Sequence, residues 1–275
     1  MTQTCSVDTS RRFGGLDRLY GPQALERLSA AHVVVAGIGG VGAWCVEALA
    51  RSGVGTITLI DMDHIAESNV NRQLHALTST LGQAKVQAMA DRIEQINPLC
   101  RVLVQDTFVE PDNVHEIIPA DAHMVIDCTD QASAKIAMIL QARHRRQALV
   151  VCGGAGGKTN PLALRSGDLS VANNDALLSK LRQVLRREHG YPRAAPGAGK
   201  VKGKVPRMHV RALWFDQQVI LPAAWQVAPE AASDPLQGLS CAGYGSAVTV
   251  TASMGLAAAS EAIQWILHGR FPATP

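Results

Sequence analysis

The chain has 275 residues, is 47% hydrophobic and carries a formal net charge of +3. This length suits one large domain with a substantial core. The six cysteines are scattered without a C-x-x-C pair, which argues against a disulfide scaffold and against a paired-cysteine zinc site. The polar opening MTQTCSVDTSRRF does not resemble a signal peptide, so we expect a reduced, cytoplasmic protein.

The charge is unevenly distributed. Between Lys180 and Arg211 there are ten basic residues and one acidic residue, which gives this window +9 and leaves −6 on the rest. Such a patch favours a polyanionic partner. The uncharged stretch 235–260 is long enough to cross a bilayer. Its later part, VTVTASMGLAAASEAIQWIL, is more typical of a small-residue helix packed on a sheet, so we do not expect membrane association.

The first half of the chain alternates strand and helix patterns. HVVVAGIGGVG predicts a strand that ends in a glycine turn, GAWCVEALARSG a helix and GTITLID a second strand, which together form a βαβ unit. A helix over GQAKVQAMADRIEQINP, strands at RVLVQ and HMVIDC, a helix over QASAKIAMILQARHRR and a strand at ALVVCGGAGG follow. This order predicts an α/β fold with a doubly wound, mostly parallel, Rossmann-like sheet.

The second half is harder to interpret. LSKLRQVLRRE predicts a basic amphipathic helix, GYPRAAPGAGKVKGK a mobile loop and RMHVRALWFD a strand. The sequence has no internal repeat and no clear linker. We therefore interpret residues 1–275 as a single domain, in which 1–157 form a nucleotide-binding core and 158–275 a C-terminal elaboration with a basic segment at 180–211.

A glycine-rich turn provides the first functional signal. Gly37, Gly39 and Gly42 follow the first strand in the spacing G-x-G-x-x-G, and Gly40 adds another small residue. Such a turn lets backbone N–H groups and a helix N-terminus approach a phosphate. Asp61, nineteen residues after Gly42, stands at the tip of the next strand, where a carboxylate meets ribose hydroxyls. The pattern predicts a nucleotide site without choosing between NAD and ATP.

The polar residues that follow favour ATP. Arg72 can fork onto phosphate oxygens, and Lys85, in the first turn of its helix, can supply a point charge to a leaving pyrophosphate. Asp130 follows a strand at its carboxyl end, where it could hold Mg²⁺ or merely cap a helix that starts near Gln131. Further side chains could complete the phosphate contacts: Asp63, Asn69, Asn71 and Gln73. Asp63 either faces the nucleotide and metal or only orders the loop that presents Arg72.

The linked motifs GIGGVG, LIDMD, SNVNRQ, GQAK and VIDCTD resemble the nucleotide site of the ubiquitin-activating-enzyme-like superfamily. That superfamily includes enzymes that adenylate sulfur-carrier proteins for molybdopterin and thiamine synthesis. The resemblance covers about residues 12–157, and RRFGGLDRLYG and CGGAGG resemble a tRNA-modifying branch most. It implies that ATP adenylates the threonyl carboxylate of threonylcarbamoyladenosine beside the tRNA anticodon, after which the carbamoyl group closes a ring and AMP leaves, with net loss of water.

The resemblance also implies roles by position. Backbone around Gly39 faces the phosphates, Asp61 holds the ribose and Asp130 binds Mg²⁺. Asn71, Arg72 and Lys85 contact phosphate. The expected catalytic set is therefore Arg72, Lys85 and Asp130, and the expected nucleotide-binding set is Gly37, Gly39, Gly40, Gly42, Asp61, Asp63, Asn69, Asn71 and Gln73.

The sequence departs from the superfamily at several points. Where relatives place an arginine that reaches into the ATP site of the partner subunit of a homodimer, this chain has Gly15, with Arg12 or Arg18 as substitutes. No zinc is expected. No cysteine stands out as a thioester-forming nucleophile, and Cys152 and Cys241 are interpreted as small buried hydrophobes.

The basic segment could hold tRNA phosphates, although a merely solvated surface is the alternative. The candidates are Lys180, Arg182, Arg186, Arg187, Lys200, Lys202, Lys204, Arg207 and Arg211. Aromatic residues are scarce there (Tyr191 and Trp214), so base stacking is not strongly indicated.

Three other functions remain open at this point. The protein could adenylate the C-terminus of a ubiquitin-like or sulfur-carrier protein. It could be a nucleotide-binding partner in a sulfur-transfer complex, beside a cysteine desulfurase or a sulfur acceptor. An NAD oxidoreductase fits least, because it leaves Arg72, Lys85 and Asp130 without a task.

Overall fold

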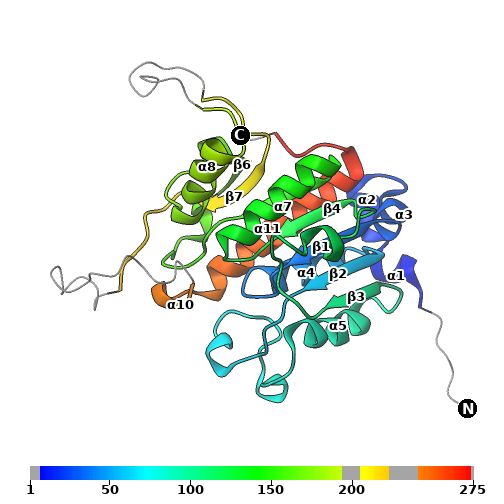
Figure 1. The fold of residues 1–275 in the computed structure, drawn as a ribbon. Helices are drawn as coiled ribbons and strands as arrows, with labels where there is room; N and C mark the ends of the chain where they lie inside the picture. Colours follow the sequence, from blue (N-terminus) through cyan, green and yellow to red (C-terminus); the bar gives the residue numbers. More distant parts are fainter. Residues whose placement is uncertain (1–6, 194–204, 223–240, 274–275) are drawn as a thin grey trace, which may run out of the picture.

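The computed structural model describes residues 7–193, 205–222 and 241–273. Their centre is one sheet with the strand order β3-β2-β1-β4-β5-β7-β6 (Figure 1). Neighbouring strands run parallel, except that β6 is antiparallel to β7. The predicted doubly wound, mostly parallel fold is confirmed. The strands are β1 (His32–Ala36), β2 (Thr56–Ile60), β3 (Arg101–Gln105), β4 (Met124–Asp127), β5 (Ala148–Cys152), β6 (Leu164–Asp168) and β7 (Arg211–Phe215).

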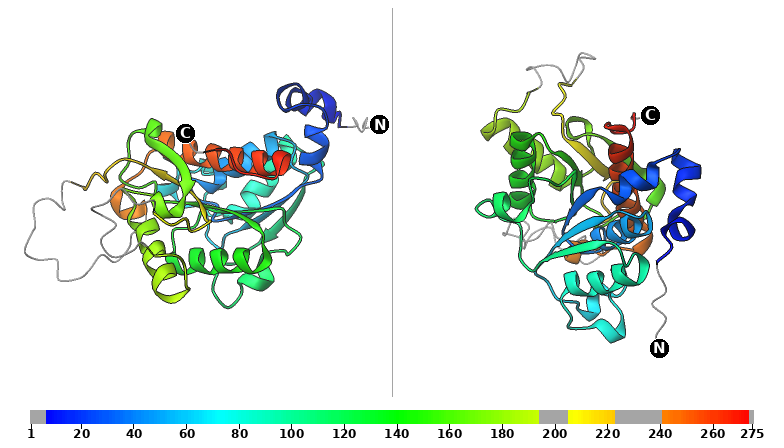
Figure 2. Two further views of the ribbon diagram at one scale, coloured as in Figure 1. Left: turned by 90° about the horizontal axis from the view of Figure 1, so that it is seen from above. Right: turned by 90° about the vertical axis from the view of Figure 1, so that its right-hand side faces the viewer.

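Helices cover both faces of the sheet, as the view from above in Figure 2 shows. One face carries α4 (Gly42–Arg51), α5 (Lys85–Ile96) and α11 (Val248–His268), and the other carries α6 (Val114–Ile117), α7 (Ala132–Arg145) and α8 (Ala176–Glu188). The shorter elements are α1 (Thr9–Phe13), α2 (Gly15–Tyr20), α3 (Ala24–Ser29), α10 (Cys241–Tyr244), η1 (Glu67–Asn69), η2 (Thr78–Thr80), η3 (Pro161–Ala163) and η4 (Leu169–Val171).

Alternate residues of each central strand enter two different cores. In β1, Val33 and Val35 pack with α4 and α11, whereas Val34 and Ala36 pack with α7 and α8. A strand that is buried on both faces is mostly apolar, which explains the hydrophobic runs VVVA in β1 and ALVVC in β5.

The C-terminal half extends the same sheet. β7 pairs with β5, and β6 forms the edge beyond it. The prediction of a strand within RMHVRALWFD is confirmed, but β6 was not predicted, because LRSGD contains no β-branched or aromatic residue. The basic helix α8 is confirmed. The predicted loop GYPRAAPGAGKVKGK lies mostly outside the described residues.

The small-residue helix predicted near the C-terminus is α11. It packs against α4 and touches β4, β5 and β7, as expected for a helix buried on a sheet. Of the helices that the described ranges contain, none has the length and apolarity needed to cross a membrane.

The order of the strands creates a crevice. The chain leaves β1 toward β2 on one side, and β4 pairs with the other side of β1. Connections therefore diverge at the carboxyl ends of β1 and β4, which is where open α/β sheets bind ligands.

Candidate nucleotide site

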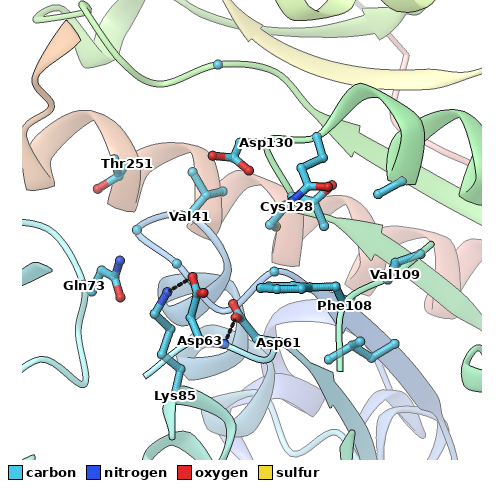
Figure 3. A pocket seen from close by; sticks show the side chains of 18 of the residues that line it. Val41, Asp61, Asp63, Gln73, Lys85, Phe108, Val109, Cys128, Asp130 and Thr251 are labelled. Carbon is cyan, nitrogen blue, oxygen red and sulfur yellow. Dashed lines mark hydrogen bonds and ion pairs between the residues drawn. The ribbon is translucent and has the colours of Figure 1, made fainter. Parts of the chain in front are cut away.

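A cavity of about 250 Å³ lies at this switch point. Its wall includes residues that follow β1, β2, β3, β4 and β5, and Figure 3 shows several of their side chains turned toward one space. Ten residues predicted from the sequence line it: Gly37, Gly39, Gly40, Asp61, Asp63, Asn69, Arg72, Gln73, Lys85 and Asp130. The cavity thus brings these residues together, while the roles expected of them stay predictions.

The glycine turn is sterically required. Gly37 has a φ of +85°, and a Cβ on it would lie 2.8 Å from the carbonyl carbon of Cys128. A Cβ on Gly42 would lie 1.8 Å from the oxygen of Gly37. Gly42 starts α4 and is not part of the cavity wall, so its contribution is to let the helix begin directly behind the turn.

Asp61 ties this turn to the end of β2. Its Oδ2 accepts the backbone N–H of Ile38 at 2.6 Å and its Oδ1 that of Asp63 at 2.9 Å. The side chain is buried, and burial raises the pKa of its carboxyl, against the opposing effects of Lys85 and of the two backbone donors. Each carboxylate oxygen has a second lone pair, so Asp61 can still accept a bond from a ribose hydroxyl.

Lys85 begins α5 and is buried, with its Nζ 2.7 Å from Oδ2 of the exposed Asp63 (Figure 3). The backbone carbonyl of Asp63 also accepts the backbone N–H of Lys85. Asp63 therefore orders the loop and holds the ammonium group at the cavity. His75 lies buried nearby, and desolvation, followed by the charge of Lys85, lowers its pKa to about 4.

The residues around Arg72 form a network of their own. Its Nη1 donates to the carbonyl of Ser68 at 2.8 Å and to Oδ1 of Asn71 at 3.0 Å. Asn71 departs from expectation, because it does not line the cavity and its amide donates to the carbonyl of Ser246. Gln73 is buried at the cavity wall, and its Oε1 has no hydrogen-bond partner within the described ranges.

Asp130 is exposed on the loop after β4, and it does not cap α7, whose N-cap is Gln131. A buried ion pair, which the sequence did not reveal, supports that loop. Nζ of Lys135 lies 3.0 Å from Oδ1 of Asp127 and 2.8 Å from the carbonyl of Cys152. Oδ1 of Asp127 also accepts from the backbone N–H and the hydroxyl of Thr129. The pair fastens the carboxyl ends of β4 and β5 together beneath the cavity.

Sequence reasoning also missed part of the cavity wall. Thr107, Phe108 and Val109 follow β3, and Thr251 enters from α11. The strand RVLVQ was predicted, so its position beside β2 could have flagged the residues after it. Thr251 comes from the far end of the chain, and no sequence pattern indicated it.

The basic helix α8 starts at the cavity. Its N-cap Asp175 accepts the backbone N–H of Leu178 and that of Gly154, and Gly154 and Leu177 line the cavity. Burial is the largest influence on the Asp175 carboxyl and raises its pKa.

The predicted tRNA contacts differ in availability. Lys180, Arg187 and Arg207 are exposed. Arg182 instead donates to the carbonyls of Leu169 and Ala172, and Arg186 donates to that of Pro192. Lys200, Lys202 and Lys204 lie outside the described residues.

Two further expectations concern residues away from the cavity. Arg12 donates to the carbonyl of Ile96 at 2.8 Å and so fastens α1 to α5, whereas Arg18 is exposed. Cys152 is buried, as predicted, and the side chain of Cys241 is outside the described part. No cluster of three or more His, Cys, Asp or Glu side chains suited to a metal ion occurs among the described residues.

The fold and the cavity define an α/β protein with a nucleotide-type site at its switch point. Comparison with known proteins makes the class more specific: the model of the ThiF family matches residues 12–274, and the chain belongs to that family. It is 41% identical to the tRNA threonylcarbamoyladenosine dehydratase of Escherichia coli (strain K12) over 257 residues, 92% of each chain.

Solved structures agree with this likeness. Those of the Escherichia coli tRNA N6-threonylcarbamoyladenosine dehydratase in complex with ATP and with AMP match with a TM-score of 0.81, at 39% and 40% identity, over 94% of this chain and 95% of theirs. The molybdopterin-synthase adenylyltransferase of Salmonella typhimurium is 36% identical over 110 residues only, 40% of this chain and 44% of that protein.

Proposed function

We propose that the protein binds ATP and uses it to dehydrate threonylcarbamoyladenosine in tRNA. The threonyl carboxylate attacks the α-phosphorus, pyrophosphate leaves and an acyl adenylate forms. The carbamoyl group then attacks the acyl carbon and expels AMP, so that the net change is loss of water. The observation that carries the proposal is the cavity that collects the glycine turn, Arg72, Lys85 and Asp130, in a chain that is similar to such dehydratases over nearly its whole length.

The geometry of the cavity suits ATP. The turn at Gly39 and Gly40 and the start of α4 offer N–H groups to phosphates. Phe108 and Val109 give an apolar wall for the adenine, and the free lone pairs of Asp61 face the ribose. The carboxylate of Asp63 holds the ammonium group of Lys85 at the cavity. The same ammonium group can bind the departing pyrophosphate there in place of the carboxylate.

A magnesium ion fits the donor set. Mg²⁺ is usually bound by one or two carboxylates together with substrate phosphates and water. Asp130 is an exposed carboxylate on the cavity wall, and Oε1 of Gln73, which has no partner in the part of the chain that the structure describes, is a second oxygen there. When bound, the ion would neutralise the charge that develops on the phosphates. The protein's own contribution is to fix Asp130 through the Asp127–Lys135 pair beneath it.

The tRNA would approach along α8. This helix begins at the cavity and carries the exposed Lys180 in its first half, so a phosphate beside the reacting nucleotide can contact it. Arg187 is exposed in the last turn and pairs with Glu188. Arg182 and Arg186 hold carbonyls of neighbouring loops and therefore support the helix more than they offer a free charge.

Adenylation of a carrier protein is the second candidate. It would use the same cavity, but the adenylyltransferase likeness covers less than half of the chain. A homodimer, a sulfur-transfer partner and a cytoplasmic location stay predictions. Light scattering of the purified protein tests directly whether it is a homodimer.

The test is a reaction with purified protein, ATP, Mg²⁺ and tRNA that carries threonylcarbamoyladenosine. We expect AMP and pyrophosphate in equal amounts and a nucleoside lighter by one water in mass spectrometry. Unmodified tRNA is the control and should give no AMP. AMP release with a sulfur-carrier protein but not with the modified tRNA would contradict the proposal and support the second candidate.

A further inference from the structure

A second cavity, of about 470 Å³, lies at the opposite end of the sheet, where β5 and β7 begin. We call it the distal pocket. Its wall combines the C-terminal end of α7, the segment 190–192 after α8, the segment 208–211 that leads into β7, and two aromatic residues near the C-terminus, Trp265 and Phe271. None of the residues assigned to ATP lines it.

Arginines and aromatic rings are paired in this pocket. The guanidinium carbon of Arg143 lies 4.7 Å from the ring centre of the buried Tyr191. That of Arg211 lies 5.4 Å from the ring centre of Phe271, and this ring packs against Trp265 with centres 4.7 Å apart. A guanidinium group that packs on an aromatic face is held in position, and its remaining N–H groups can still bind a phosphate.

The acids next to the pocket are already engaged. Glu261 pairs with Arg211, and Asp168 accepts the backbone N–H groups of Met208 and His209. Arg143 and Arg146 are exposed, and neither forms an ion pair with any residue that the structure describes. The pocket therefore has positive charge available for an external anion.

Two residues that line the distal pocket have a left-handed backbone conformation. Arg146 has a φ of +54° and His209 a φ of +57°. Arg146 is the C-cap of α7, where a left-handed residue is a common helix ending, whereas His209 adopts this conformation outside any helix, at a cost of about 1–2 kcal/mol. Half of the four such residues among those described line this one pocket.

α8 connects the distal pocket to the nucleotide cavity. Its N-cap Asp175 bonds Gly154 of the nucleotide cavity, and at its other end the N–H of Tyr191 bonds the carbonyl of Leu185. Thirteen helical residues span about 20 Å. A ligand that contacts both pockets must therefore be longer than a mononucleotide.

We propose that the distal pocket is a second RNA-contact site. It holds phosphates of the tRNA backbone on Arg143 and Arg146, at about the length of α8 from the nucleotide that reacts. This inference rests on the proposed function. The proposed site includes α7 and the C-terminal segment, which lie outside the basic segment 180–211 that the sequence indicated for tRNA.

The test uses the full chain and compares two double variants with equal loss of charge. R143A/R146A changes the distal pocket. R11A/R101A is the control, because Arg11 and Arg101 are exposed on α1 and on β3, the other edge of the sheet. Affinity for full-length tRNA is measured by fluorescence anisotropy between 50 and 200 mM KCl, and circular dichroism establishes that each variant is folded.

We expect R143A/R146A to bind tRNA at least about tenfold more weakly at low salt, and the slope of log K against log[salt] to fall by about two, roughly one for each phosphate that the variant no longer binds. The control should stay within about twofold of the parent protein. In turnover assays the KM for tRNA should rise in R143A/R146A, while the affinity for ATP is unchanged. R143K/R146K keeps the charge and should restore most of the salt slope.

An unchanged affinity and salt slope in a folded R143A/R146A protein would overturn the inference and leave the proposed function standing. A decrease in affinity equal to that of the control double variant would also overturn it, because it would reflect net charge alone. Failure of the parent protein to dehydrate modified tRNA would instead refute the proposed function. The two failures are therefore distinguishable in one set of experiments.

Discussion

At the carboxyl ends of the strands two lysines are buried and paired with carboxylates, whereas at the amino ends of β5 and β7 Arg143 and Arg146 stay exposed. Lys135 and Asp127 are fully buried, and Lys85 is 5% exposed. A buried charge needs a fixed partner, so this end is rigid and its groups keep their positions. An exposed arginine keeps most of its hydration and is available to a polyanion. The same residue types thus suit chemistry at one end and salt-sensitive binding at the other.

Removal of the buried ammonium should have the largest effect on stability. In Lys135→Met the carboxylate of Asp127 is left buried without its cation, and we expect a loss of about 3–5 kcal/mol in the free energy of unfolding. Arg146→Met at the exposed end should cost less than about 1 kcal/mol. Urea denaturation measures both. Equal losses would remove the contrast between the two ends. The double variant D127N/K135M should recover part of the loss, because no charge is then left unpaired.

Asp130 provides the next test, because it is an exposed carboxylate at the nucleotide cavity. Asp130→Asn should lower the rate of AMP formation by about 10²–10³-fold, the usual effect of removing one electrostatic interaction with a transition state. Its stability should stay within about 0.5 kcal/mol of the parent, since the side chain is exposed. Asp112→Asn, on the exposed segment before α6, is the matched control and should react normally. Retained activity in the Asp130 variant would exclude it from the reaction.

The sequence predicted the fold and most of the nucleotide cavity because both follow from local patterns. Strand, turn and helix signals lie within the segment that forms them. Asp61 directly follows β2, Lys85 begins α5, and Asp130 lies on the short loop between β4 and α7. The Asp127–Lys135 pair was not predicted, because burial of both partners depends on how β4, β5 and α7 pack. Asn71 was assigned from its neighbours, yet its side chain turns to Ser246, which is 175 positions away. The distal pocket combines four distant segments and left no pattern in any of them.

His75 offers a pH test of the buried end. Burial lowers its pKa from 6.5 to about 4, so below pH 6.5 the unfolded chain binds a proton that the folded protein does not. This contribution to stability is present above pH 6.5 and is lost as the pH falls toward 4. Between pH 7 and pH 5 we expect the loss to be about 2 kcal/mol. Urea denaturation at the two pH values measures it, and in His75→Leu the difference should shrink by that amount. An unchanged pH dependence would show that His75 does not titrate in this way.

The smallest expected effects concern Lys180 and Arg182 of α8, which the sequence analysis both assigned to tRNA binding. Lys180 is exposed, so Lys180→Ala should leave stability unchanged, weaken tRNA binding a few-fold and lower the salt slope by about one. Arg182 donates to the carbonyls of Leu169 and Ala172, so Arg182→Ala should cost about 1–2 kcal/mol of stability and change the salt slope little. Anisotropy titrations measure the salt slope of each variant, and urea denaturation measures the stability of each. If Arg182→Ala changed the slope more than Lys180→Ala, the arginine would contact phosphate despite its bonds to the protein. The exposure of a side chain in the free protein would then not distinguish the residues that bind phosphate from those that support the helix.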